Sequence, residues 1–420
     1  MVLKIPYDKE FLDLNIADEK VRAVLRASTD DFAPEKIEPE LVQDALQNPI
    51  DSAPLRELAV GKNNVVVITS DHTRAVPSKI TLPLLLAEIR AGNPDAKITI
   101  LIATGAHRAM TEAEQRAKFG DEIVDHEKIV NNDAFGNDFN FIRKLPSGAD
   151  FWLNNVAMNC DLLVAEGFVE PHFFAGFSGG RKSILPGVCN ITTIKQNHSY
   201  MALNSHYATA GVTTNNPVHH DMVTAAKIAK LQFILNVALN SKKQVIAAFA
   251  GDMETAHNKA VEFVSSISAR EAVESDIVIT SNGGYPLDQN LYQGPKAVAT
   301  AAKCCRKNGV IIMSCACSDG FGGESFKKLM KMGNPAEIEE YLSKIEPEYT
   351  LPQQWCVQKF VEVLKDRKLI LISALPDDDV VKANMIPAHS MDEALAKAYE
   401  IVGDDAMATI IPDGVAVFCK

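Results

Sequence analysis

Four stretches of this chain place histidine, arginine, lysine, aspartate and glycine directly after apolar runs of strand length. They lie at residues 70–77, 104–108, 166–183 and 281–290. Imidazole gains or loses a proton near neutral pH, and guanidinium and ammonium groups bind phosphate or carboxylate. Because ligands of open α/β sheets gather beyond the carboxyl ends of the strands, we expect these stretches to meet at one edge and to form one site.

Single residues in these stretches have both functional and structural interpretations. His107 and His172 each follow a buried strand in a loop that contains glycine, so either could transfer protons or be a hydrogen-bonded structural histidine. Lys182, in the sequence Gly-Gly-Arg-Lys, is a candidate for binding an anion or for forming a covalent link. Arg74 and Arg108 could bind a ligand or form structural ion pairs.

Two familiar phosphate-binding motifs are nearly present in the sequence, but each differs from its consensus at one position. In residues 176–183 (GFSGGRKS), Arg181 stands where a P-loop has its second glycine. In residues 319–325 (DGFGGES), Ser325 replaces the last glycine of G-x-G-x-x-G. The sequence also contains no H-E-x-x-H and no Cys/His zinc spacing. It therefore favours neither a nucleotide triphosphatase nor a simple NAD enzyme.

The elements that must position these residues alternate between short apolar runs and longer helical patterns, which is typical of an α/β fold with a mostly parallel sheet. We expect strands at residues 65–69, 97–103, 161–165, 232–239, 276–280, 309–314 and 368–373. We expect helices at residues 78–91, 253–268 and 391–402, and a Thr-x-x-Glu capping box at residues 111–114. Residues 245–249 are expected to form a hairpin with 232–239.

The chain of 420 residues is long enough for two domains. We expect two Rossmann-like α/β domains with the active-site cleft between them. A polar stretch at 265–275 suggests a cofactor-binding, catalytic domain over residues 1–268, completed by 405–420, and a second α/β domain over 272–400 that contributes substrate contacts. The final run, 408–411 and 415–418, could form a hairpin with either domain.

Charge and composition exclude several partners. The chain has 42 Lys and Arg against 54 Asp and Glu, a formal net charge of −12, which argues against a nucleic-acid or anionic membrane surface. No apolar run approaches the roughly 18–20 residues that span a bilayer, and Pro6 and Asp8 interrupt any signal-peptide core. The eight cysteines include no C-x-x-C pair, so we expect reduced thiols and a cytoplasmic protein. A local cluster of Arg74, Arg108, Arg181, Lys182 and Lys296 is expected around the cleft.

One long run, Gly-Phe-x-Glu-x-His-Phe-Phe-Ala-Gly-Phe-Ser-Gly-Gly-Arg-Lys-Ser at residues 167–183, is highly specific. With the stretches at 70–77, 103–108, 251–257 and 282–296, it resembles the nickel-pincer lactate racemase family. The resemblance extends from Tyr7 to residues 410–414. It implies a racemase that interconverts L- and D-lactate through a nickel pincer nucleotide, a pyridinium-3,5-bisthiocarboxylic acid mononucleotide that carries nickel and that other proteins must synthesise.

The resemblance also implies a role for individual residues. Lys182 would carry the cofactor through a thioamide link, and His198 would complete a square-planar nickel site. His107 and His172 would be the catalytic acid/bases. The remaining candidates are a loop that holds the nucleotide and a segment that contacts substrate: Asp71, His72, Thr73 and Arg74 in the loop, and Tyr292, Gln293 and Lys296, together with Arg74, around the substrate.

The chemistry explains why such residues are needed. The α-hydrogen of lactate is a poor acid because the neighbouring carboxylate disfavours more negative charge, so its removal as hydride to a pyridinium ring is favoured. A base must then lie near the hydroxyl group of each mirror-image substrate, and two histidines meet that need. Phe173, Phe174 and Tyr292 favour a short aliphatic acid, while malate or aldonic acids remain alternatives. A non-catalytic protein that binds an anionic ligand or a cofactor is the alternative from another class.

Overall fold

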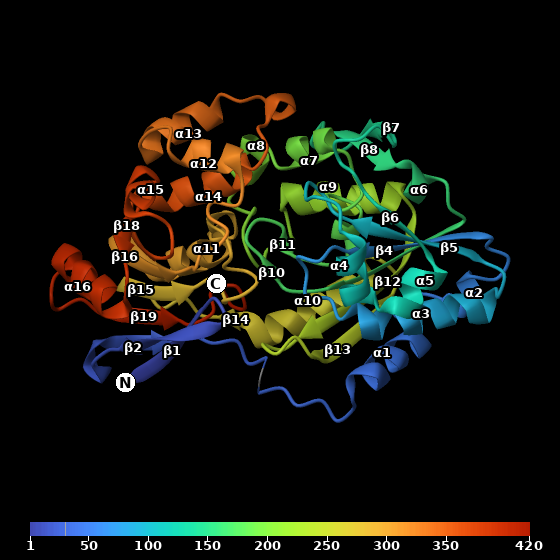
Figure 1. Cartoon of the computed structure of the whole chain (residues 1–420), viewed down its shortest axis with the longest axis horizontal. Coiled ribbons are helices and arrows are strands. Elements are labelled where there is room, and N and C mark those ends of the chain that lie inside the picture. The colour runs from blue at the N-terminus through green and yellow to red at the C-terminus, as the bar shows by residue number, and fades with distance from the viewer. Residues whose placement is uncertain (30) are drawn as a thin grey trace.

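Two six-stranded sheets organise the residues that this computed structural model describes, 1–29 and 31–420 (Figure 1). The first sheet has the order β13-β12-β9-β4-β5-β6. Its strands are β4 (Asn64–Ser70), β5 (Lys97–Ala103), β6 (Lys128–Asn131), β9 (Leu162–Phe168), β12 (Leu231–Leu239) and β13 (Val245–Gly251). Neighbouring strands are parallel except β12 and β13, which form the expected antiparallel hairpin. The prediction of an α/β fold with mostly parallel sheets is confirmed.

Both faces of the first sheet are buried, as in other parallel sheets. Along β4, Val65 and Val67 pack into one apolar cluster, while Val66 and Ile68 pack into another. The first cluster includes α1 (Glu38–Gln47), α2 (Leu55–Leu58), α3 (Ser78–Gly92), α4 (Glu112–Phe119) and α5 (Asp121–His126). The second includes α6 (Asn155–Met158), α7 (Ile191–Asn197) and α9 (Pro217–Ile228). The predicted capping box is present at the start of α4.

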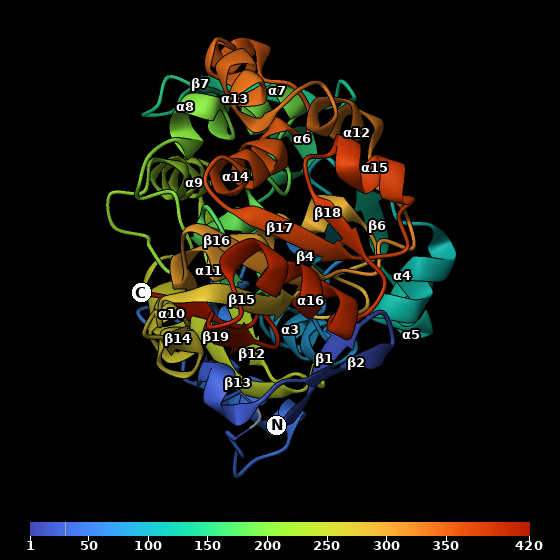
Figure 2. The same cartoon turned by 90° about the vertical axis from the view of Figure 1, so that its left-hand side faces the viewer.

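The second sheet is entirely parallel and has the order β18-β17-β16-β15-β19-β3. Its strands are β3 (Val21–Val24), β15 (Ser275–Ser281), β16 (Cys305–Ser314), β17 (Lys368–Ile372), β18 (Ile386–Ala388) and β19 (Ala408–Ile411). The helices around it are α11 (Pro295–Cys304), α12 (Glu324–Met330), α13 (Pro335–Ser343), α14 (Gln354–Leu364), α15 (Asp377–Lys382) and α16 (Met391–Val402). Figure 2 shows α16 beside the hairpin of β1 (Val2–Tyr7) and β2 (Glu10–Asn15).

The two ends of the chain differ from our expectation. The strand at 408–411 forms no hairpin with 415–418, because β19 lies between β15 and β3 in the second sheet. Residues 1–24, which we expected in the first domain, also contribute β1, β2 and β3 to the second half. Only the very end returns to the first half: β20 (Phe418–Cys419) pairs with β14 (Ala269–Arg270), and the Phe418 ring lies 5.7 Å from that of Phe177. Local patterns reveal strands but not the sheet they join.

The remaining elements are short strands and helices outside the two sheets. They are β7 (Phe139–Lys144), β8 (Asp150–Asn154), β10 (Pro171–His172), β11 (Gly176–Phe177), α8 (Tyr200–Leu203), α10 (Thr255–Ser268) and the short 3-10 helices η1 (Asp18–Lys20), η2 (Gly180–Ser183), η3 (Leu291–Gln293) and η4 (Pro347–Tyr349). Lys359 and Gln358 of α14 donate hydrogen bonds to carbonyl oxygens of α8, which joins the two halves. All eight cysteines are free thiols. Among the described residues, none of the helices has the length and apolar content required to cross a membrane.

Candidate active site

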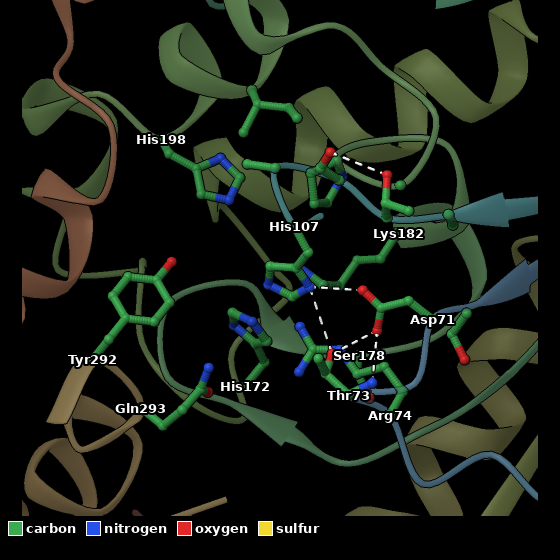
Figure 3. A pocket seen from close by; sticks show the side chains of 18 of the residues that line it. Asp71, Thr73, Arg74, His107, His172, Ser178, Lys182, His198, Tyr292 and Gln293 are labelled. Atoms are coloured by element: carbon green, nitrogen blue, oxygen red, sulfur yellow. Dashed lines mark hydrogen bonds and ion pairs between the residues drawn. The ribbon is translucent and has the colours of Figure 1, made fainter. Parts of the chain in front are cut away.

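A cavity of about 630 Å³ lies between the two halves of the molecule. Residues of both halves line it, and they include the residues to which the family resemblance assigns roles: Asp71, His72, Thr73, Arg74, His107, His172, Lys182, His198, Tyr292, Gln293 and Lys296. Figure 3 shows Tyr292 and Gln293 entering from the second half, while the other labelled side chains come from the first. The ends of three neighbouring strands of the first sheet, β9, β4 and β5, therefore meet at this cavity, as expected for parallel strands. The stretch 281–290 follows β15 of the second sheet, and of its residues only Asn290 lines the cavity.

His107 is held by a buried carboxylate. Its Nδ1 atom lies 2.7 Å from Oδ2 of Asp71, which is 1% exposed and follows β4 (Figure 3). Burial alone would raise the pKa of Asp71, but hydrogen bonds from His107 and Thr73 and the charge of Arg74 outweigh it and hold that pKa well below its usual range. An ionised Asp71 requires the proton on Nδ1 of His107. Nε2 is then an acceptor, and among the described residues it has no hydrogen-bond partner.

Two charged groups that we had not predicted support the loop that carries Asp71. Glu166, inside β9, is 1% exposed and accepts hydrogen bonds from Thr69 (2.5 Å), Ser78 (2.6 Å) and Thr81. It thus connects the strand before the loop with the helix after it. On another side, Nζ of Lys118 donates to the carbonyl oxygen of Arg74 at 2.8 Å. The sequence signalled Glu166 only by its position after a strand, and nothing in the sequence signalled Lys118.

The second candidate acid/base, His172, lies on the short β10–β11 hairpin. Its ring stacks on Phe173 with 5.0 Å between centroids, and it meets Phe174 edge-on at 4.6 Å. Its Nδ1 atom accepts a hydrogen bond from the backbone N–H of Ala175 at 3.3 Å. Burial and the positive charges of Lys182 and Lys296 lower the pKa of His172 well below its usual value. The ring is therefore a neutral imidazole near pH 7.

Lys182 and His198 both face the cavity without a polar partner. The Lys182 amine lies 5.8 Å from the ring centroid of Phe174 and makes no hydrogen bond with the described residues. Burial, with the positive charge of Arg181 next, lowers its pKa. His198, 4% exposed, has an Nδ1 atom without a partner in the described chain, and burial, with the charge of Lys182, lowers its pKa to about 3. A neutral imidazole is the form that ligates metals, and a neutral amine is the form that makes covalent bonds.

The second half contributes a cation and an aromatic wall. Nζ of Lys296 is buried and has no hydrogen-bond partner in the described chain, and burial lowers its pKa to about 8. The hydroxyl oxygen of Tyr292 accepts a hydrogen bond from the indole N–H of Trp355 at 2.8 Å. Trp355 also meets His198, with 5.2 Å between ring centroids. We had not predicted Trp355 or its neighbour Cys356 in the site, because α14 carries no sequence signal of a ligand. A buried, unpaired ammonium fits a substrate carboxylate.

Two residues of the expected basic cluster, Arg108 and Arg181, do not present an unpaired charge to the cavity. Arg108 lies on its wall, but its guanidinium pairs with Glu114 at 2.5 Å. His72 lies nearby, with Nε2 3.9 Å from the same carboxylate. The expectation for Arg181 is wrong: its side chain is fully buried and is not part of the cavity lining, because it points into the protein toward its own turn.

Comparisons with known proteins match both halves of the chain to lactate racemases. Residues 7–211 match the family described as the lactate racemase N-terminal domain, and residues 270–419 match the lactate racemase C-terminal domain. The chain is 46% identical to a lactate racemase of Thermoanaerobacterium thermosaccharolyticum, over 100% of this chain and 99% of that protein. It is 44% identical to a lactate racemase of Lactiplantibacillus plantarum, over 100% of both.

Solved structures agree with this result. The lactate racemase apoprotein of Thermoanaerobacterium thermosaccharolyticum superposes with a TM-score of 0.97 at 45% identity over the full length of both chains. A Thermotoga maritima protein shares the fold, with a TM-score of 0.69 at 19% identity over 90% of this chain and 97% of that one. On these matches, which cover both halves and the cavity between them, the chain belongs to the lactate racemase family.

Proposed function

We propose that this protein interconverts L- and D-lactate, with His107 and His172 as alternating acid/bases. One observation carries the proposal: two imidazoles and a buried, unpaired ammonium, that of Lys296, line one cavity between the two halves. The two bases suit two mirror-image hydroxyl groups, and the ammonium suits the carboxylate that both enantiomers share.

We infer that the cavity holds a nickel pincer nucleotide linked to Lys182. The residues fit such a group, because the Lys182 amine has no hydrogen-bond partner among the described residues and His198 is a buried imidazole with an unpartnered nitrogen. Thr73 and Arg74 lie in the same lining and supply donors for a nucleotide. When bound, this group supplies an acceptor for the substrate α-hydrogen as hydride, beside a nickel ion that His198 helps to hold. Proteins that make and deliver the group would be transient partners.

The residues of the chain account for the proton transfer. Lys296 and Gln293 bind the carboxylate of lactate and so fix its α-carbon in the cavity. Nε2 of His107 takes the hydroxyl proton from one enantiomer, and the carboxylate of Asp71 stabilises the imidazolium that forms. As the α-hydrogen leaves as hydride, the substrate becomes a neutral ketone beside its carboxylate. Formation of the other enantiomer would require the ketone to rotate and to take hydride on its opposite face. His172 is the base for the hydroxyl group of that enantiomer. In the opposite direction His172 first takes a proton from solvent and then donates it to the ketone oxygen, while His107 releases its proton to solvent.

The substrate class follows from the walls of the cavity. Phe173, Phe174, Tyr292 and Trp355 surround the bases with aromatic surface, which suits a methyl group better than a second carboxylate. We therefore propose lactate or another short aliphatic 2-hydroxy acid, ahead of malate and aldonic acids. A non-catalytic anion-binding protein would need the cations but would not need the Asp71–His107 pair.

The experiment is racemisation by cofactor-loaded protein, followed by chiral chromatography of enantiopure 2-hydroxy acids. We expect equilibration of L- and D-lactate and slower or no equilibration of malate. Substrate deuterated at the α-carbon should keep its label through each turnover. Label exchanged with solvent at every turnover would contradict hydride transfer, and retained enantiomeric purity in loaded protein would contradict the racemase proposal altogether.

A further inference from the structure

The side chain of Arg181 occupies the interior of the first half. It is 0% exposed, it is outside the cavity lining, and no carboxylate of the described residues forms an ion pair with it. Burial lowers its pKa to about 9, which leaves the guanidinium charged at neutral pH. A buried charge without a counterion is costly unless hydrogen bonds satisfy it completely.

Four backbone carbonyl groups of a single turn surround the guanidinium. Nη2 donates to the oxygens of Ala175 (2.9 Å) and Phe177 (2.7 Å). Nη1 donates to the oxygens of Ser178 (3.2 Å) and Gly179 (3.1 Å). These carbonyls come from residues 175–179, directly before Arg181 in the chain. One planar group thus fills the inside of the turn that leads to Lys182.

Two histidines complete the enclosure, the buried His257 and the partly exposed His219. Nε of Arg181 donates to Nδ1 of His219 at 3.1 Å, and Nε2 of His257 lies between Nη1 of Arg181 (2.9 Å) and the oxygen of Ser178 (2.8 Å). Burial and the charge of Arg181 lower the pKa of His219 to about 3 and that of His257 well below its usual value. His219 is therefore neutral and is available as the acceptor for the fifth guanidinium N–H group.

On its outer side, the same turn packs closely against neighbouring residues at Gly179 and Gly180. Gly179 and Gly180 have positive φ angles of 76° and 51°. A Cβ atom on Gly179 would lie 2.7 Å from Oδ1 of Asn236, and one on Gly180 would lie 2.8 Å from Cδ2 of His257. The N–H of Gly180 donates to the same Asn236 oxygen at 2.8 Å. The turn is therefore held from both sides in one conformation.

We propose that Arg181 is a positioning residue that fixes Lys182 and the hairpin of His172 relative to each other. The carbonyls of Ala175 and Phe177 belong to or adjoin β11, which pairs with the strand of His172, while those of Ser178 and Gly179 lead into the turn of Lys182. A lysine at position 181 would keep the charge but would offer three donors on a flexible stem instead of five in one plane. The inference rests on the proposed function for the roles of Lys182 and His172.

The test is labelling of Lys182 in protein without cofactor. Pyridoxal 5′-phosphate, a pyridine aldehyde with a phosphate, condenses with an amine to an imine and water, and borohydride then delivers hydride to give a stable secondary amine. Peptide mass spectrometry gives the labelling rate at Lys182, and Lys182→Ala identifies the peptide. We expect Arg181→Lys and Arg181→Met to label at least tenfold more slowly than the unchanged protein.

Two further variants distinguish a change in the position of Lys182 from a general loss of protein stability. Leu395→Ala, in α16 of the second half, lowers stability far from the turn and should label Lys182 at the original rate. His219→Leu removes one of the five acceptors and should slow labelling about threefold, which decides the question if the Arg181 variants do not fold. Labelling at the original rate in folded Arg181→Lys, or in His219→Leu, would overturn the inference.

A second readout distinguishes this inference from the proposed function. In cofactor-loaded protein, kcat per bound nickel should fall in Arg181→Lys and stay unchanged in Leu395→Ala. If loaded protein with Arg181 intact does not racemise lactate, the proposed function fails, while the labelling rates still decide the role of Arg181.

Discussion

The pair of Asp71 and His107 allows one prediction to be worked out in full. Asp71→Asn keeps the size of the side chain but removes the charge that lies 2.7 Å from Nδ1 of His107. When His107 takes the substrate proton, it becomes an imidazolium that the neutral amide no longer stabilises. The loss should therefore appear in the step that forms this cation and much less in substrate binding.

The size of the expected fall in kcat follows from the burial of Asp71 and His107. A hydrogen bond between charged groups contributes about 1.5–3 kcal/mol, and two unit charges about 4 Å apart interact by about 4 kcal/mol at an effective dielectric constant near 20. Thr73 and Arg74 already compensate part of the Asp71 charge, so the lower range applies. A loss of about 3 kcal/mol, at about 1.4 kcal/mol for each tenfold, predicts a fall in kcat of about a hundredfold.

The assay is chiral analysis of lactate turnover, with kcat expressed per bound nickel. We expect unchanged nickel content and a similar KM. Because the two enantiomers have equal free energy, kcat/KM must fall by the same factor in both directions. Asp276→Asn is the control: this carboxylate lies at the start of β15, outside the cavity lining, and accepts hydrogen bonds from Arg306 and the N–H of Met407, so its loss should lower stability and leave kcat unchanged. A kcat within threefold of the original in Asp71→Asn would refute the reasoning.

Four other predictions address the remaining groups. Lys182→Ala should abolish the covalent adduct, which intact mass measures, and an adduct of the same mass in this variant would show that another residue carries it. Lys296→Met should raise KM for lactate about 30- to 100-fold through loss of a charge-assisted hydrogen bond, with a smaller effect on kcat. Because burial lowers the pKa of Lys296 to about 8, its ammonium loses charge as the pH rises through 8, so KM should rise above that pH and stay level below it; a flat profile that persists to pH 9.5 would argue against this role. Glu166→Gln weakens the acceptor of three buried hydroxyl groups and should lower Tm, measured by calorimetry, as well as kcat, whereas unchanged values would mean that the loop does not depend on it.

Much of the site could be predicted because its residues follow strands directly. Asp71 and His107 come after β4 and β5, and the carboxyl ends of parallel strands meet wherever those strands pair. The residues of the second half were reached only through the resemblance to a family, since nothing local shows that the segment of Tyr292 faces His172. Trp355 was missed for the same reason: it lies in an ordinary amphipathic helix and enters the site only through packing.

The sequence by itself determined the local structure and the chemical groups, because strand and helix periods and the residues that follow each strand depend only on neighbours in the chain. The tertiary structure alone decided where distant parts meet and which way a side chain turns. β3 and β19 are nearly 400 residues apart in the chain but adjacent in one sheet, where apolar side chains of both pack into the same core cluster. Arg181 and its neighbour Lys182 are both basic, so the sequence does not distinguish them. In the folded chain the guanidinium of Arg181 points into the protein, where four carbonyl oxygens of its own turn accept its hydrogen bonds.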